Sequence, residues 1–425
     1  MNKKSYDSFL AILNNELVVA LGCTEPIAIA YAGAKARQVL GRMPEKCTVC
    51  CSGNIVKNVK GVTVPNSGGL KGIEIAVILG IVGGDPDSEL TVLEAVTEEH
   101  ITRAKELQAI DFCQCELQEN VAGLYIKVTL TAGEDTVEVT VADYHTNIVR
   151  ITKNANVIFS KERDASDQNE NEPDKSLLTV RDILAFADQV KIDDVREVLS
   201  RQVEYNSAIS REGLRHPYGV EVGRCLMNDF DSQNVKLRAK AAAAAGSDAR
   251  MSGCPLPVVI NSGSGNQGIT VTMPVVEYAK EYGASEEKLY RALVVSNLVA
   301  IHQKKYIGSL SAYCGAVSAA CGSGAGIAYL LDCSYGEICN TITNTIGNIG
   351  GMVCDGAKPS CAAKIASAVE AAILALHLSR KNQVFQPGEG LVKEDIEQTI
   401  TSIGRMGRDG MKATDVEILN IMLEK

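Results

Sequence analysis

Three cysteines in the second half of the chain have the residue type and the surroundings of metal ligands. Cys314 lies in a segment of mostly small residues, 311–316, and Cys354 and Cys361 flank a loop that contains Gly and Pro. A loop lets two thiolates converge on one metal centre, which two rigid helical positions could not do freely. The spacing is neither a C-x-x-C zinc pair nor a ferredoxin run. Three thiolates would hold three irons of a [4Fe–4S] cluster and leave the fourth open as a Lewis acid.

The competing interpretation of these cysteines is packing, because small buried thiols fill tight contacts between helices. Packing accounts best for the thiols that stand in helix-like sequence, namely Cys321, Cys333 and Cys339. The C-x-x-C of residues 47–50 could complete a zinc site with Cys113 and Cys115. The better explanation of these four cysteines is that they alternate with other side chains along predicted strands.

A fourth cysteine, Cys23, stands at a break directly before a predicted helix, in the segment LGCTEP of residues 21–26. The positive end of a helix dipole lowers the pKa of a thiol toward the thiolate range. Cys23 is therefore a candidate for acid–base chemistry, and a buried thiol at a turn is the alternative.

Two glycine-rich loops could bind a small anion. They span residues 65–72 (PNSGGLKG) and 261–268 (NSGSGNQG), and loops of this kind expose backbone N–H groups. Neither has the spacing of a P-loop or of a dinucleotide fingerprint. A tight turn is the alternative for each loop.

The elements that would position these residues change in type along the chain. Residues 6–21 and 27–40 carry apolar side chains at roughly helical spacing. Strand patterns occupy residues 47–64 and then an antiparallel meander at 124–130, 136–144 and 147–152. Helices predominate after residue 177, and segment 361–378 is apolar nearly all round, which predicts a central buried helix.

These patterns predict an α+β protein: a mostly helical catalytic domain with an inserted α+β domain that carries an antiparallel sheet. We expect residues 1–42 to form helices that pack on the C-terminal domain. Residues 43–160 would form the α+β domain, 161–175 a polar linker, and 176–425 the helical domain that holds the three cysteines.

Composition excludes several classes of function. With 425 residues, 46% hydrophobic and 22% charged, the chain should fold around more than one core. A net charge of −10 and 4% aromatic residues with no Trp argue against nucleic-acid binding. Residues 306–331 carry no charge but are only modestly hydrophobic, and the N-terminus lacks a secretion signal. We therefore expect a cytoplasmic protein with reduced thiols and no membrane partner.

Together these motifs resemble the L-cysteine desulfidase family, which includes an uncharacterised bacterial branch and is related to the α chain of iron–sulfur L-serine dehydratases. The resemblance rests on residues 22–26, 66–72 and 263–268 and on the three cysteines, and it covers essentially the whole chain. It implies an oxygen-sensitive [4Fe–4S] cluster, no pyridoxal phosphate, and β-elimination of L-cysteine to pyruvate, ammonia and hydrogen sulfide.

The resemblance also assigns roles to residues. Cys314, Cys354 and Cys361 would be the cluster ligands, and Cys23 would cap the open iron at rest or remove the α-proton. The two loops would hold the carboxylate and ammonium of the amino acid, with Lys71 as a carboxylate partner or simply a solvated lysine. The predicted substrate-binding residues are Asn66, Ser67, Gly68, Lys71, Ser262, Gly263, Ser264, Gly265 and Asn266.

The chain departs from the serine dehydratase pattern in its cysteines. The loop between Cys354 and Cys361 is shorter, and no cysteine follows Cys361 to act as the tail ligand of some dehydratases. We therefore expect L-cysteine as substrate, with L-serine or another β-substituted amino acid as the alternative. A non-catalytic thiol or metal-binding protein is the alternative of a different class, and Cys321 is the alternative to Cys314 as a ligand. The large apolar helical domain is compatible with a homodimer.

Overall fold

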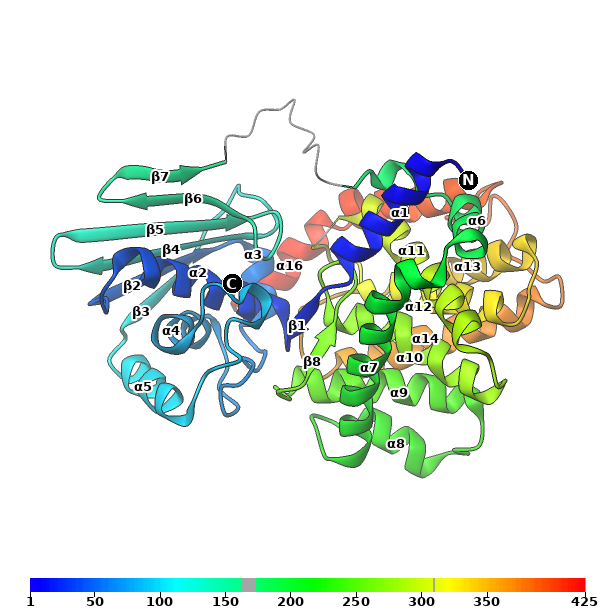
Figure 1. The fold of residues 1–425 in the computed structure, drawn as a ribbon, viewed down its shortest axis with the longest axis horizontal. Coiled ribbons are helices and arrows are strands. Elements are labelled where there is room, and N and C mark those ends of the chain that lie inside the picture. The colour runs from blue at the N-terminus through cyan, green and yellow to red at the C-terminus, as the bar shows by residue number, and fades with distance from the viewer. Residues whose placement is uncertain (162–172, 309, 425) are drawn as a thin grey trace.

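A six-stranded sheet forms the core of an α+β lobe, on the left of Figure 1. The structure is a computed structural model that describes residues 1–161, 173–308 and 310–424. The strands of the sheet are β2 (Lys46–Cys51), β3 (Cys113–Leu117), β4 (Tyr125–Ala132), β5 (Asp135–Ala142), β6 (Ile148–Lys153) and β7 (Asn156–Ser160), in the order β3-β2-β4-β5-β6-β7. The predicted meander is confirmed, and β4 buries every second side chain. The sheet is mixed rather than antiparallel throughout, because β2 pairs in parallel with β3.

The helices of this lobe correct two expectations. They are α2 (Thr24–Leu40), α3 (Gly53–Val59), α4 (Ile73–Gly83) and α5 (Glu98–Ala109), with the short η1 (Glu89–Thr91). Residues 53–59, predicted as strand, are therefore helical. Helix α2 was expected on the C-terminal domain but packs on β4, β5 and α4. A Cβ on Gly80 of α4 would overlap the backbone oxygen of Ala30, so glycine permits this close crossing.

The second lobe is helical, as predicted, which confirms the α+β class. Its elements are η2 (Lys175–Leu177), α6 (Val180–Gln189), α7 (Ile192–Arg215), α8 (Val222–Asp229), α9 (Val235–Met251), α10 (Gly265–Glu281), α11 (Glu286–Ile307), α12 (Gly315–Leu330), α13 (Tyr335–Ile349), α14 (Cys361–Ser379) and α15 (Ile396–Arg405). Helix α1 (Lys3–Glu16) packs on α7 of this lobe, as expected. Helix α14 is long and apolar enough to cross a membrane by length and composition alone. It packs against α9, α12 and α13, as a core helix does.

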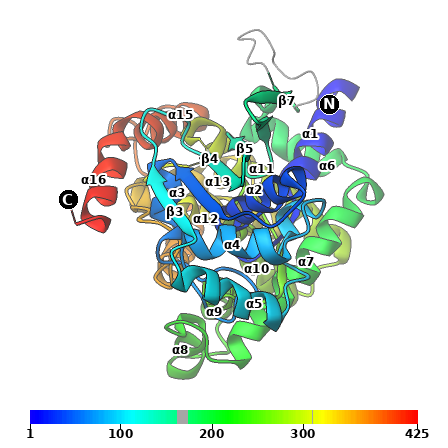
Figure 2. The same cartoon turned by 90° about the vertical axis from the view of Figure 1, so that its left-hand side faces the viewer.

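Three segments join the lobes. Strand β1 (Val19–Leu21) pairs antiparallel with β8 (Pro257–Val259), a pairing absent from the sequence prediction. After the π-helical turn η3 (Met406–Gly410), α16 (Lys412–Met422) returns to pack on α3, beside the α+β lobe in Figure 2. Buried Lys57 of α3 forms an ion pair with Asp415 of α16. The third segment is the predicted linker, 161–175, most of which lies outside the described residues.

A buried carboxyl between α8 and α9 makes stability depend on pH. Asp248 is 1% exposed and accepts a hydrogen bond from the Gly223 backbone at 3.0 Å, and burial raises its pKa to about 6. The folded state therefore keeps a proton that the unfolded chain loses near pH 4, so stability falls as pH rises. Between pH 4.5 and 7.5 this group should cost about 2 kcal/mol. In urea unfolding of the apo-protein, the free energy of unfolding of Asp248→Asn should fall by about 2 kcal/mol less than that of the wild type between pH 4.5 and 7.5. Parallel pH profiles for variant and wild type would contradict the assignment.

Candidate functional site

A small cavity between the two lobes brings the four predicted cysteines together. Its volume is about 100 Å³, and Cys23, Cys314, Cys354 and Cys361 all line it. The α+β lobe and the helical lobe both contribute walls, as is common for binding sites. Cys321 lies inside α12, fully buried, and is not part of this lining. Of the two cysteines considered as a cluster ligand, Cys314 lines the cavity and Cys321 does not.

Backbone pairing holds Cys314 and Cys354 side by side. The Cys314 N–H donates to the Met352 carbonyl at 3.1 Å, and the Cys354 N–H donates to the Ala312 carbonyl at 2.6 Å. A hydrogen bond from the Cys314 thiol lowers the pKa of Cys354 to about 6, against the effect of burial, and Lys57 and Lys364 add to the lowering. The same contact and burial raise the pKa of Cys314. One of the two sulfurs is thus prepared as a thiolate.

Three of the four thiols stand at helix N-termini. Cys23 is the N-cap of α2, Cys314 is the N-cap of α12, and Cys361 is the first residue of α14. Helix N-termini stabilise negative charge. Three helix N-termini around one cavity would stabilise the negative charge of several thiolates bound to one metal centre.

The loop between Cys354 and Cys361 depends on one glycine. Gly356 has φ +98°, and a Cβ there would overlap the backbone oxygen of Lys57 in α3. Gly356→Ala should introduce about 1–3 kcal/mol of strain and displace the loop. We expect less iron per chain after anaerobic reconstitution than in Gly351→Ala, a nearby control where a Cβ meets no atom within 4 Å. Equal iron in the two variants would show that the loop does not need this conformation.

Cys23 has a carboxylate partner that the sequence reasoning missed. Its Sγ donates to Glu25 Oε2 at 3.1 Å. Burial, and after it the charge of Glu25, raise the pKa of Cys23 well above its usual range, although Arg250 acts in the opposite direction. The expected lowering by the helix dipole is therefore wrong for this thiol in this structure. Cys23 is held as a protonated thiol that has a proton acceptor beside it.

The loop of residues 261–268, a predicted substrate-binding loop, lies at the cavity. Ser262, Gly263, Ser264 and Asn266 line it, and the Thr24 hydroxyl donates to the Gly263 carbonyl at 2.9 Å. Gly265 lies just behind the lining, because a Cβ there would overlap Nε of Arg250. The antiparallel pairing of β1 with β8 ties the two segments together, and the Thr24–Gly263 hydrogen bond brings the loop beside the start of α2.

The loop of residues 66–72 lies outside the cavity lining. Asn66 Nδ2 donates to three carbonyls of residues 93–96, and the Ser67 hydroxyl donates to the Leu70 carbonyl at 3.1 Å. Gly68 is not part of the lining either, and Lys71 is exposed, which matches its interpretation as a solvated lysine. The preceding Pro65 packs so closely on Gly22 that a Cβ there would overlap it. This loop supports the turn before Cys23.

Several polar residues at the cavity have buried atoms without a partner, and three of them (Arg250, His145 and Tyr313) lie outside the loops singled out from the sequence. Buried polar atoms without a hydrogen-bond partner among the described residues include, at this lining, Arg250 Nε, His145 Nε2, Asn266 Oδ1, Gln267 Oε1 and the Tyr313 hydroxyl. Burial lowers the pKa of His145, so its ring stays neutral near pH 7. Buried polar groups almost always have partners. Their concentration here indicates that the cavity holds a polar ligand.

The donor set fits an iron–sulfur cluster. Within the described ranges, no three His, Cys, Asp or Glu side chains converge closely enough to hold a single metal ion. Cys314, Cys354 and Cys361 instead surround a cavity, as ligands to separate irons of one cluster would. Thiolates are the usual ligands of such clusters. Helix N-termini and two nearby lysines would stabilise the negative charge.

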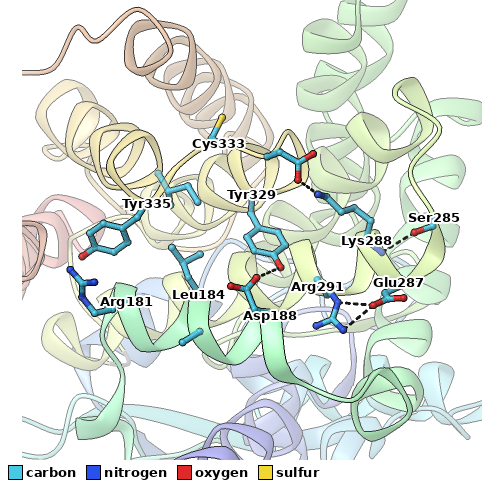
Figure 3. A pocket seen from close by; sticks show the side chains of 13 residues that line it. Arg181, Leu184, Asp188, Ser285, Glu287, Lys288, Arg291, Tyr329, Cys333 and Tyr335 are labelled. Atoms are coloured by element: carbon cyan, nitrogen blue, oxygen red, sulfur yellow. Dashed lines mark hydrogen bonds and ion pairs between the residues drawn. The ribbon is translucent and has the colours of Figure 1, made fainter. Parts of the chain in front are cut away.

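A larger cavity, of about 700 Å³, lies elsewhere in the helical lobe, between α6, α11 and α13. Figure 3 shows that most of its charged groups interact with neighbours in the cavity, and Arg181 lies over the Tyr335 ring. Asp188 accepts from the Tyr329 hydroxyl at 2.7 Å, Arg291 pairs with Glu287 at 2.9 Å, and Lys288 pairs with Asp332. Groups already satisfied in this way leave little for a ligand to bind, so size does not make this cavity the better candidate.

Comparison with known proteins agrees with this site. Residues 87–420 match the model of the serine dehydratase alpha chain family. A relative named UPF0597 protein from Lachnoclostridium phytofermentans is 53% identical over 98% of this chain and 100% of its own. A second relative, from Desulfitobacterium hafniense, is 52% identical over 99% of this chain and 97% of its own. A third, from Treponema denticola, is 46% identical over 100% of this chain and 99% of its own. The resemblance to the iron–sulfur serine dehydratase α chain is confirmed. The chain belongs to the serine dehydratase α-chain family, a family of iron–sulfur lyases.

Proposed function

We propose that this protein is a cytoplasmic, pyridoxal-independent iron–sulfur lyase that converts L-cysteine into pyruvate, ammonia and hydrogen sulfide. The observation that carries the proposal is the meeting of Cys23, Cys314, Cys354 and Cys361, from distant parts of the chain, at one cavity. Held by the last three, a [4Fe–4S] cluster would supply an iron with an open position, a Lewis acid for the leaving sulfur.

The chain's own groups account for the proton transfer. Elimination breaks the Cα–H and Cβ–S bonds and forms a C=C bond, and the resulting aminoacrylate takes up water to give pyruvate and ammonia. Cys23 can remove the α-proton once its own proton has passed to Glu25, whose Oε2 lies 3.1 Å from Sγ. The raised pKa of Cys23 keeps its thiol protonated near pH 7, so the proton must leave Sγ before the sulfur can act as a base.

Apolar lining next to the ligand cysteines favours a thiol as the leaving group. Ala316, Ala357 and Ile365 follow Cys314, Cys354 and Cys361 closely in sequence, and all three line the cavity. A thiol hydrogen-bonds weakly and tolerates such walls, whereas a hydroxyl needs partners. Dehydration of L-serine by the same chemistry is the second candidate, because the matching family model describes serine dehydratase α chains.

The test is anaerobic purification, reconstitution with iron and sulfide, and assay of pyruvate and sulfide from L-cysteine and of pyruvate from L-serine. Cysteine turnover that disappears in air supports the proposal, and faster turnover of serine supports the second candidate. Bound iron with no turnover of L-cysteine or L-serine would support the cluster but reject both substrates. About one zinc per chain with no iron would indicate a non-catalytic metal-binding protein.

A further inference from the structure

A carboxylate near the C-terminus connects the two lobes through both of its oxygens. Asp415 lies in the first turn of α16 and is partly buried. Its Oδ1 forms an ion pair with Nζ of Lys57 in α3, and its Oδ2 accepts a hydrogen bond from the Ala312 backbone N–H at 2.9 Å. Lys57 belongs to the α+β lobe, whereas Ala312 lies just before α12 of the helical lobe. One side chain thus ties a helix of the first lobe to the segment that leads to Cys314.

The peptide group held by Asp415 belongs to the backbone pairing of the predicted iron ligands. The Ala312 N–H donates to Asp415, and the Ala312 carbonyl accepts from the Cys354 N–H at 2.6 Å. This pairing is an isolated antiparallel bridge rather than part of a sheet. An isolated pair of extended segments is only marginally stable by itself. A further contact that fixes Ala312 therefore stabilises the spacing of Cys314 and Cys354.

The π-helical turn before α16 contacts the same segment. The Ser311 hydroxyl donates to the Gly407 carbonyl of η3 at 2.6 Å and accepts from the Tyr313 N–H at 3.0 Å. Gly407 also packs closely, because a Cβ there would lie 3.1 Å from Cβ of Tyr313. The C-terminal segment of residues 406–422 therefore holds residues 311–313 at several points.

The cation of the ion pair lies at the loop that follows Cys354. Lys57 is 2% exposed, and its backbone oxygen lies so close to Gly356 that a Cβ on that glycine would overlap it. The charge of Lys57 also acts on Cys354. A lysine buried to this extent needs a partner of opposite charge. Asp415 supplies it, so the carboxylate also fixes the helix against which this loop packs.

We propose that Asp415 is a positioning residue of the proposed iron site, which sets the spacing of Cys314 and Cys354 by holding the Ala312 peptide against α3. The inference rests on the proposed iron–sulfur function and adds to it a residue outside the cavity lining. It also gives α16 a part in the site, although no cysteine follows Cys361. Because Asp415 acts through a backbone hydrogen bond, an acceptor of the same shape should replace it.

The test compares two variants that differ in one hydrogen-bond acceptor. Asp415→Asn keeps a side-chain oxygen for the Ala312 N–H, and Asp415→Ala does not. Both are made together with Lys57→Met, so that neither leaves a buried cation without its partner. After anaerobic reconstitution, in competition with a chelator, we expect Asp415→Ala to bind iron about 10–100-fold more weakly than Asp415→Asn, the usual cost of losing a group that orients a metal ligand. The control pair, Glu417→Gln and Glu417→Ala, changes an exposed carboxylate of the same helix and should show equal iron affinity.

A second measurement needs no iron. In the anaerobic apo-protein, alkylation of individual cysteines is followed by peptide mapping. Asp415→Ala should raise the alkylation rates of Cys314 and Cys354 about tenfold over those in Asp415→Asn, because loss of a hydrogen bond makes local opening easier. Cys321, fully buried in α12, should react at the same rate in both variants, and it reports global unfolding. The two Asp415 variants with Lys57 intact carry the same prediction if Lys57→Met does not fold.

Equal iron affinity and equal alkylation in the two variants would overturn the proposal. It would also fail if Cys321 became reactive together with Cys314 and Cys354, since Asp415 would then serve global stability alone. A difference in alkylation in a protein that binds no iron would reject the proposed function and keep Asp415 as the residue that spaces these two thiols. A difference in iron affinity without turnover of L-cysteine or L-serine would reject both substrates and keep the positioning role.

Discussion

Cys354→Ala is expected to abolish both iron binding and turnover. Cys354 is the thiol whose pKa falls to about 6, so its sulfur is the one most ready to bind a metal. Loss of a residue that only orients a metal ligand costs about 10–100-fold in affinity or activity, and loss of the ligand itself should exceed that. Iron per chain, the visible absorbance of the reconstituted protein and pyruvate from L-cysteine are the measurements.

The matched control for this variant is Cys321→Ala. Cys321 is fully buried inside α12, only seven residues beyond Cys314, and does not line the cavity. It should keep its iron and lose only a little stability from the smaller side chain. If Cys321→Ala lost its iron while Cys314→Ala kept it, the ligand assignment within this segment would have to be exchanged.

Cys23→Ala is expected to keep the iron and lose turnover by about 10²–10⁴-fold, the usual contribution of a general base. The three ligand cysteines are untouched by this change, and Cys23 stands on a different helix from any of them. Exchange of the α-proton of L-alanine with deuterated water isolates the proton-transfer step from sulfide release. This exchange should also be lost in the variant.

Cys51→Ala serves as the control for this second variant, since Cys51 is fully buried in β2 of the α+β lobe and outside the cavity lining. It should exchange the α-proton at the wild-type rate. Loss of iron in Cys23→Ala would make Cys23 a required ligand rather than a base. Wild-type exchange in that variant would remove it from proton transfer altogether.

The class of the fold could be predicted, and the cysteines that line the cavity could be singled out, because both have local signals. Alternation of apolar residues marked β4, β5 and β6, and the all-round apolar pattern marked α14 as a core helix. Cysteines beside glycine and proline can likewise be recognised within a single short segment. Each of these features depends on neighbours in sequence, which is the range over which periodicity and turn chemistry act.

The remaining parts of the site depend on contacts between distant segments. The pairing of β1 with β8 involves short strands, too brief to show a period, yet it ties the segment before Cys23 to the segment before the loop of residues 261–268. Arg250 follows a run of alanines that reads only as helix, and His145 lies in a strand connection. Arg250 Nε and His145 Nε2 are buried without a hydrogen-bond partner among the described residues, which no single segment reveals. The Asn66 loop had a suggestive composition, but its polar groups bind its own and neighbouring backbone.

The junction at Gly22 divides the proposed machinery between the two lobes. Gly22 has φ +57° and separates β1, which is paired with the helical lobe, from α2, which packs on the sheet. The proposed base, Cys23, therefore begins a helix of the α+β lobe, whereas Cys314 and Cys361 stand at the starts of helices of the other lobe. The proposed site is complete only where the two lobes meet. A change that disturbed this contact would separate the proposed base from the proposed iron ligands even if each lobe stayed folded.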